Sequence, residues 1–150
     1  MAENTATHRF ALRASWSGDG AGTGRATLPE GAPIDFAGAT VLDGAGGRAN
    51  PETLLLSALS ACYLNTWAIF LKKLAIPYAD PALEASCEVG KDEAGGFKLL
   101  GARLTVKVPG AILEAQRAQV EKTVALAEKY CIVSKAVRAA MPLEVSIEES

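Results

Sequence analysis

The stretch NPETLLLSALSAC, residues 50–62, opens the strongest helix start in the chain. Asn50 is a favourable N-cap, Pro51 suits the first helical position, and Glu52 complements the positive end of the helix dipole. The nineteen positions that follow Glu52, residues 53–71, carry no charge, and Lys72 and Lys73 close the run. The pattern predicts one long helix that ends near residue 74.

An apolar run of this length raises the question of a membrane span, since about twenty apolar residues can cross a bilayer. Ser57, Ser60, Asn65 and Thr66 interrupt the run, and its start is capped like that of a soluble helix. We therefore interpret it as a helix buried on nearly all sides and expect no membrane partner. One chain of 150 residues has little else to wrap around such a helix, so we expect a homodimer.

Composition narrows the class of protein. The chain is 21% charged and 49% hydrophobic, which is ordinary for a globular protein. A net charge of -2 offers no field that would attract phosphate backbones, so we expect no nucleic-acid partner. The first residues have neither a basic start nor an apolar core, which favours a cytoplasmic location. With no repeat, low-complexity tract or linker, residues 1–150 are expected to form one domain.

Strands and helices fall into separate blocks, which predicts an α+β class. The segment 8–16 places Phe10, Leu12, Ala14 and Trp16 on one face, as in a half-buried strand. The other predicted elements are strands at 25–28, 33–37, 83–89, 97–108 and 143–147, and helices at 112–129 and 131–140.

No cofactor or metal is expected. The glycine-rich segment 18–24 lacks the ending of a phosphate-binding loop and the spacing of a dinucleotide motif, so it predicts a hairpin turn. His8 is the sole histidine, and no cysteine lies in a C-x-x-C pair, which argues against a zinc site.

The three cysteines differ in their surroundings. Cys87 lies among inward residues of a predicted strand, where cysteine behaves as a small hydrophobe. Cys62 lies inside the apolar helix, about 80° and roughly 15 Å from Glu52 along the same helix, too far for direct contact. Cys131 begins a helix, whose dipole can favour a thiolate. Residue types and spacing alone leave reactive and structural roles open for Cys62 and Cys131.

Two motifs resemble the OsmC/Ohr family of osmotically inducible and organic hydroperoxide resistance proteins. The stretch at 50–62 is similar to the family signature of Asn-Pro-Glu, an apolar helix and a reactive cysteine. The segment Cys131-Ile132-Val133-Ser134 is similar to its Cys-Pro-x-Ser segment, with isoleucine in place of proline. The resemblance implies an OsmC-like fold, with antiparallel sheets wrapped around a long central helix in an intertwined homodimer.

The resemblance also implies roles for individual residues. Cys62 is expected to be the peroxidatic cysteine and Cys131 the resolving one, joined by a disulfide after oxidation. Glu52 is expected to hold an arginine that stabilises the Cys62 thiolate. Arg25 is our first choice for that arginine, and Arg48 is its competitor.

The implied activity is a thiol-dependent peroxidase that reduces organic hydroperoxides through a sulfenic acid, with a lipoyl-type or thioredoxin-type dithiol as reductant. Leu59, Trp67 and Phe70 are candidate apolar walls for the substrate, although they also fit a plain core. Tyr63 stands where many members carry phenylalanine, and we expect it to bear on substrate fit. The alternatives are a non-catalytic redox sensor or small-molecule-binding protein on the same fold, and a structural domain with inert cysteines.

Overall fold

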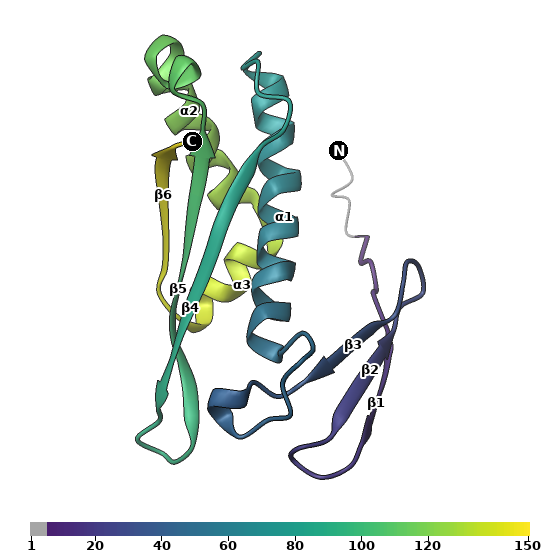
Figure 1. Cartoon of the computed structure of the whole chain (residues 1–150). Helices are drawn as coiled ribbons and strands as arrows, with labels where there is room; N and C mark the ends of the chain where they lie inside the picture. The colour runs from purple at the N-terminus through teal and green to yellow at the C-terminus, as the bar shows by residue number, and fades with distance from the viewer. Residues whose placement is uncertain (1–5) are drawn as a thin grey trace. The chain divides into compact units, whose positions relative to one another are not determined.

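A computed structural model describes residues 6–150 of the chain. They form two compact units that divide at Leu54, and each unit is described by itself. The order of elements is three strands, a long helix, two strands, two helices and a last strand (Figure 1). This order and the α+β class agree with the prediction from the sequence.

The unit up to Leu54 is built on a small antiparallel sheet. Its strands are β1 (Arg13–Ser17), β2 (Thr23–Thr27) and β3 (Ile34–Ala37), in that order, and a short 3-10 helix, η1 (Thr40–Leu42), follows. The predicted hairpin turn lies between β1 and β2. Gly18 takes a φ of 96° there, a backbone angle that favours glycine.

The prediction of a half-buried strand from His8 was wrong. The strand begins at Arg13, which pairs with Thr27 at the end of β2, so no described strand lies opposite residues 8–12. Without a ladder partner this segment stays extended and open, and Phe10 is 94% exposed. Trp16, at the other end, packs its ring 6.0 Å from that of Phe36.

The unit Leu55–Ser150 packs helices against a second sheet. The long helix α1 (Pro51–Lys73) enters this unit at residue 55 and is followed by β4 (Ala82–Lys91), β5 (Phe97–Val108), α2 (Gly110–Tyr130), α3 (Ile132–Ala140) and β6 (Leu143–Glu149). The strand order is β4-β5-β6, so β5 is central. Strands β4 and β5 are antiparallel, whereas β6 runs parallel to β5 and departs from the expected antiparallel pattern. The reason is that α2 and α3 form a crossover, which carries the chain back to the start of β5 before β6 begins.

The core of this unit lies between α1, α2 and the sheet. Every fourth residue of α1 is buried, giving a stripe of Leu59, Tyr63, Trp67 and Leu71. Opposite it, the central strand contributes three fully buried side chains, at positions 104, 106 and 108. Two buried polar groups of α1 form hydrogen bonds with α2. The Tyr63 hydroxyl donates to the Val124 carbonyl at 3.0 Å, and the Trp67 indole N–H donates to the Thr123 hydroxyl at 3.0 Å.

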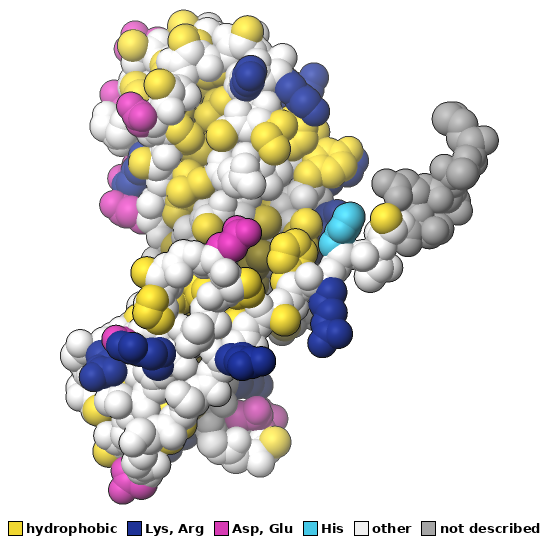
Figure 2. Space-filling view, turned by 90° about the vertical axis from the view of Figure 1, so that its right-hand side faces the viewer, with side chains coloured by type: hydrophobic (Ala, Val, Ile, Leu, Met, Phe, Trp, Pro, Cys, Tyr) yellow, Lys and Arg dark blue, Asp and Glu magenta, His cyan; other side chains and the backbone are white. Residues whose placement is uncertain are grey.

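Helix α1 is long and apolar enough to cross a membrane by length and composition alone, yet it supplies this core. The expectation that it is buried on nearly all sides was wrong for the single chain. Four of its 23 residues are buried, and Ala58, Ala61, Asn65 and Ile69 are exposed. The sheet and the other two helices of one chain fully cover only one stripe of it. Figure 2 shows hydrophobic side chains open to solvent on the side of the molecule that carries α1.

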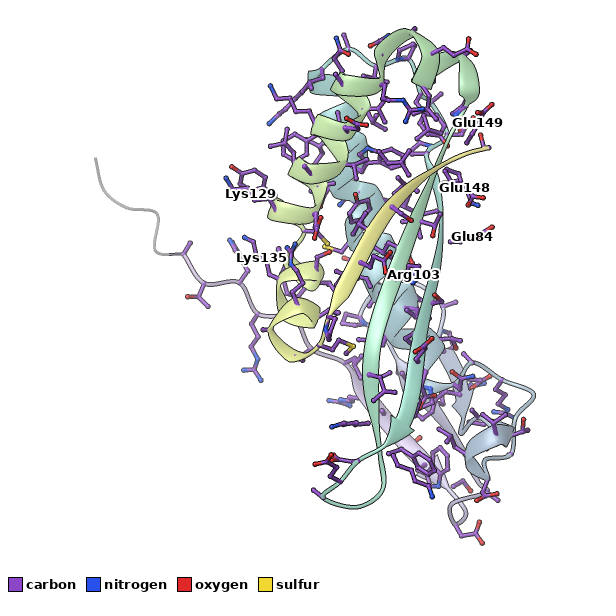
Figure 3. The ribbon with its side chains drawn as sticks, turned by 90° about the vertical axis from the view of Figure 1, so that its left-hand side faces the viewer. Glu84, Arg103, Lys129, Lys135, Glu148 and Glu149 are labelled. Carbon is purple, nitrogen blue, oxygen red and sulfur yellow. The ribbon has the colours of Figure 1, made fainter. Side chains whose placement is uncertain are left out.

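The other face of the sheet is polar. Lys107 Nζ lies 3.4 Å from a Glu84 carboxylate oxygen and 2.5 Å from one of Glu148, and Arg103 pairs with Glu144 at 3.0 Å. Figure 3 shows Glu84, Arg103 and Glu148 along these strands, away from the helices. These ion pairs mark the face of the sheet that is open to solvent, whereas Cys62 and Cys131 belong to the helical elements on the other face.

Candidate functional site

The structure brings two of the sequence-predicted residues, Cys62 and Cys131, together. Cys62 lies in the middle of α1 and is half-buried. Cys131 lies in the joint between α2 and α3 and is fully buried. A hydrogen bond joins the two thiols, with Cys131 donating to Cys62. Both sulfurs are free thiols in this state.

The start of α3 provides further donors to this pair. Cys131 has extended backbone angles, φ -65° and ψ 117°, so it ends α2 and serves as the N-cap of α3. Its Sγ accepts a hydrogen bond from the backbone N–H of Ser134 at 3.4 Å. The backbone N–H groups of Ile132 and Val133, which have no partner within the helix, donate to Cys62. Backbone N–H groups at the start of α3 therefore donate to both sulfurs.

The two thiols have opposite pKa shifts. Burial acts to raise the pKa of Cys62, but the hydrogen bonds from the α3 backbone and from Cys131 outweigh it and lower that pKa below its ordinary value. The Thr66 hydroxyl, in the next turn of α1, donates to the Cys62 backbone carbonyl at 2.8 Å. Burial raises the pKa of Cys131, and the neighbouring Cys62 sulfur raises it further. The two shifts favour Cys62 over Cys131 as the thiol of the pair that ionises first.

An ion pair fixes the position of α3. Arg138 donates to the Glu128 carboxylate and to the Glu128 backbone carbonyl, each at 2.6 Å. This contact ties α3 to the last turn of α2. Arg138 belongs to the last turn of α3, the end of that helix that lies away from Cys131 in sequence.

Glu52 lies in the first turn of α1, ten residues before Cys62. Its Oε2 atom is buried and has no hydrogen-bond partner among the described residues. A buried carboxylate oxygen without a donor is unfavourable, and a guanidinium is the partner that suits it best. That Glu52 receives an arginine stays a prediction, and the unpartnered oxygen is the atom to which it applies.

Neither candidate arginine is paired with Glu52 in this structure. Arg25 forms a two-pronged ion pair with Asp35, at 2.6 and 2.9 Å, and Arg48 Nη1 lies 3.9 Å from the same carboxylate. The hydrogen bond from Arg25 holds the pKa of Asp35 below its usual range. Sequence reasoning missed Asp35. The available signal was the β2–β3 register, which sets Arg25 directly opposite Asp35.

The candidate apolar walls separate into two groups. Leu59 and Trp67 are fully buried core residues, as is Tyr63, whose hydroxyl is bound to α2. The expectation that Tyr63 bears on substrate fit therefore does not match its position. Phe70 is only half-buried, and its ring lies 5.6 Å from that of Tyr130, the residue before Cys131. Tyr130 is exposed, so this aromatic pair lies at the surface of its unit.

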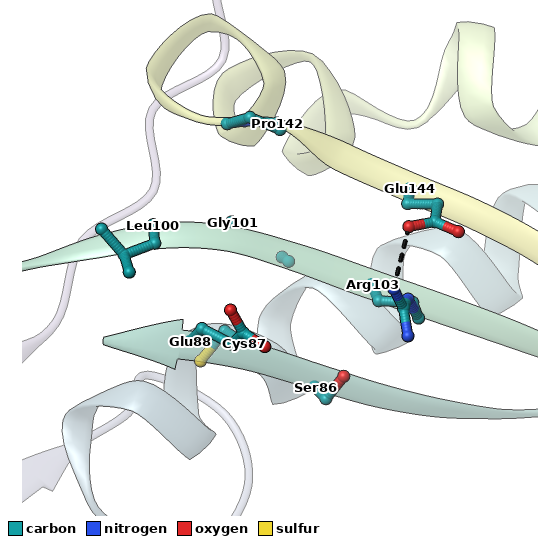
Figure 4. A pocket seen from close by; sticks show the side chains of 9 residues that line it. Ser86, Cys87, Glu88, Leu100, Gly101, Arg103, Pro142 and Glu144 are labelled. Carbon is teal, nitrogen blue, oxygen red and sulfur yellow. Dashed lines mark hydrogen bonds and ion pairs between the residues drawn. The ribbon is translucent and has the colours of Figure 1, made fainter. Parts of the chain in front are cut away.

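Cys87 lies apart from this pair. It is half-buried on β4 and lines a small pocket of about 190 Å³, together with Glu88, Leu100 and Pro142 (Figure 4). Neither Cys62 nor Cys131 lines that pocket. Within residues 6–150, no group of three His, Cys, Asp or Glu side chains could hold a metal ion.

An α+β fold that brings two thiols into contact at a helix start defines a two-cysteine thiol protein. A family model described as OsmC-like protein matches residues 44–146, and the chain belongs to this family. The chain is 32% identical, over 71% of its length and 72% of the relative's, to organic hydroperoxide resistance protein-like 2 of Staphylococcus epidermidis.

Solved structures of the family have the same fold. An organic hydroperoxide resistance protein OsmC from Legionella pneumophila matches with a TM-score of 0.76 at 24% identity, over 95% of this chain and 99% of that one. OhrB of Bacillus subtilis matches with a TM-score of 0.71 at 25% identity, over 93% and 98%. The family and these relatives support a peroxide-related redox role.

Proposed function

We propose that this protein is a thiol-dependent peroxidase that reduces organic hydroperoxides to alcohols. The observation that carries the proposal is the contact between Cys62 and Cys131 at the start of α3. A peroxidatic sulfur must be ionised to attack, and a resolving sulfur must be near it. The depressed pKa of Cys62 and the adjacent Cys131 thiol supply these two conditions.

The first half of the cycle oxidises the protein. The Cys62 thiolate attacks one peroxide oxygen, the O–O bond breaks, and the other oxygen leaves with a proton as the alcohol. Cys62 becomes a sulfenic acid. The Cys131 sulfur then attacks Cys62, water leaves with the sulfenic oxygen, and a disulfide forms. An external dithiol, lipoyl-type or thioredoxin-type, supplies the two electrons that restore both thiols.

A guanidinium would strengthen the first step. We propose that Glu52 receives an arginine, Arg25 in first place and Arg48 in second, and that this arginine stabilises the Cys62 thiolate. The buried, unpartnered Oε2 of Glu52 supports such a pairing. The arginine would have to exchange Asp35 for Glu52, which an exposed ion pair permits because it is held only weakly.

The assembly proposed here is an intertwined homodimer. The exposed apolar positions of α1 support a second subunit as their cover. We also propose that residues 1–150 work as one domain, since the family match at 44–146 spans the division at Leu54. A cytoplasmic location suits a protein that keeps its cysteines reduced and depends on a dithiol.

Catalytic turnover tests the proposal. Purified protein should consume cumene hydroperoxide continuously with dihydrolipoamide or reduced thioredoxin, and one equivalent of peroxide should yield a Cys62–Cys131 disulfide by mass spectrometry. Oxidation without turnover with any dithiol would favour the redox sensor. If both thiols stayed titratable after peroxide, the cysteines would be inert and the proposal wrong.

A further inference from the structure

Beside the two sulfurs lies a buried hydroxyl that the oxidative steps do not use. Ser134 is in the first turn of α3, three residues after Cys131, and both side chains are fully buried. Its Oγ atom has no hydrogen-bond partner among the described residues. Burying a hydroxyl without a partner is unfavourable, so a position of this kind calls for an explanation.

The neighbour of this hydroxyl is the Cys131 sulfur. The backbone N–H of Ser134 already donates to Cys131 Sγ at 3.4 Å. The hydroxyl lies near enough to lower the pKa of Cys131, against the larger effect of burial. While Cys131 is a neutral thiol, it is only a weak acceptor, so the contact between the hydroxyl and the sulfur is weak. A charged sulfur at the same place would accept one.

The two sulfurs also differ in access. Cys62 is half-buried and Cys131 is 0% exposed. In a disulfide between them, an attacking thiolate can reach Cys62 but is screened from Cys131 by protein atoms. Attack on Cys62 makes Cys131 the leaving group, and exchange is faster when the leaving thiolate is stabilised. A buried sulfur needs hydrogen bonds for that purpose, because water cannot supply them.

We propose that an external dithiol attacks the Cys62 sulfur of the disulfide, and that Cys131 leaves as a thiolate which accepts hydrogen bonds from the hydroxyl and the backbone N–H of Ser134. This inference rests on the proposed peroxidase cycle. The dithiol's first sulfur forms a mixed disulfide with Cys62 as the Cys62–Cys131 bond breaks. The dithiol's second thiol then loses its proton to solvent, closes a ring with the first sulfur and releases Cys62 as a thiolate, while the Cys131 thiolate takes up a proton. Two electrons pass from the dithiol to the protein.

The test compares the two halves of the cycle in Ser134→Ala. Reduction of the peroxide-oxidised protein by dithiothreitol, followed by stopped flow, should slow by about tenfold, since one hydrogen bond to a charged sulfur is lost. The rate at which cumene hydroperoxide oxidises Cys62 should not change. Ser134→Thr, which keeps the hydroxyl, should retain the rate of reduction. Ser146→Ala, in β6, is the matched control for loss of a serine hydroxyl.

A structural role for Ser134 would slow both half-reactions or neither, and either result would overturn the proposal. The direction of attack is tested separately in the wild-type protein, even if Ser134→Ala does not fold. Glutathione added to the disulfide form should give a mixed disulfide on Cys62, mapped by mass spectrometry. An adduct on Cys131 would overturn the proposal and leave the peroxidase function intact. If no Cys62–Cys131 disulfide forms with peroxide, the proposed function itself is wrong.

Discussion

The thiol pair and the arginine–carboxylate group are held in opposite ways. Cys62 and Cys131 lie within one compact unit, and buried contacts with α2 and α3 fix their surroundings. Arg25 and Asp35 pair on the surface of the other unit, with side chains 59% and 40% exposed. Buried contacts fix geometry, whereas exposed ion pairs are weak and easily exchanged. The thiol pair is therefore held firmly within its own unit, whereas the Arg25–Asp35 pair can exchange partners within its own.

Removing a sulfur should have the largest effect. Cys62→Ser should abolish peroxide reduction, because serine does not ionise at neutral pH. Cys131→Ser should react once with cumene hydroperoxide and then stall or over-oxidise, since nothing resolves the sulfenic acid. Cys87→Ser is the matched control and should turn over normally, because Cys87 lies outside the thiol pair. Peroxide consumption and the mass of the oxidised protein measure all three, and full activity in Cys62→Ser would refute the assignment.

Removing the guanidinium should have a smaller effect. An opposite charge beside a titrating group shifts its pKa by about one to three units, so Arg25→Ala should lower kcat/KM at pH 7 by about tenfold to a hundredfold. Glu52→Gln should lower it in the same direction, because the arginine loses its anchor. Arg48→Ala, assayed beside them, decides between the two arginines. A loss in Arg48→Ala with none in Arg25→Ala would reverse our order of preference.

The reactivity of Cys62 should depend on pH with a definite sign. Because its pKa is lowered, the reactive thiolate is present above that pKa and lost as the pH falls through it. The rate of alkylation of Cys62 by iodoacetamide should therefore rise to a plateau with a midpoint below about 8.5, the value of a free cysteine. Cys131→Ala removes one donor to the Cys62 sulfur and should move the midpoint upward. A wild-type midpoint at or above that of free cysteine would contradict the role of the α3 amides.

Altering the core behind the thiols should reduce stability and spare the chemistry. Tyr63→Phe leaves the Val124 carbonyl without its partner, which should lower the free energy of unfolding by about 1 to 3 kcal/mol. Urea denaturation measures the change. Where both forms are folded, the rate of peroxide reduction should change by no more than about twofold, because the Tyr63 hydroxyl bonds to α2 in the core. A large loss of activity would restore Tyr63 as a specificity residue.

The smallest effect on stability should come from Asp35→Asn. An exposed ion pair contributes little, so the Tm should stay within about 3 °C of wild type. Freed from Asp35, the arginine should pair more readily with Glu52, and peroxide reduction should hold or rise. A marked fall in activity would mean that Asp35 holds the arginine in its active position, which would contradict the exchange of Asp35 for Glu52.

The sequence predicted the long helix and the order of elements, and it singled out the two cysteines that the structure brings together, because capping residues and a specific motif carry local information. It did not predict the parallel pairing of β6, which depends on the length and path of the α2–α3 crossover. The predicted strand at 8–16 was too long at its N-terminal end, because the alternation of apolar and polar residues does not show where the partner strand ends. Asp35 and the donors from α3 were missed because their roles arise from register and from backbone groups, which side-chain patterns do not display.

The parallel pairing of β5 with β6 has a consequence for biosynthesis. Strand β6 is the last element of this fold and seals the crossover that contains Cys131. Synthesis proceeds from the N-terminus, so Cys62 emerges from the ribosome well before its partner sulfur can be enclosed. During that interval Cys62 also lacks the α3 N–H groups that lower its pKa, so the donors that favour its thiolate and its partner sulfur are supplied together, when the last elements of the fold dock.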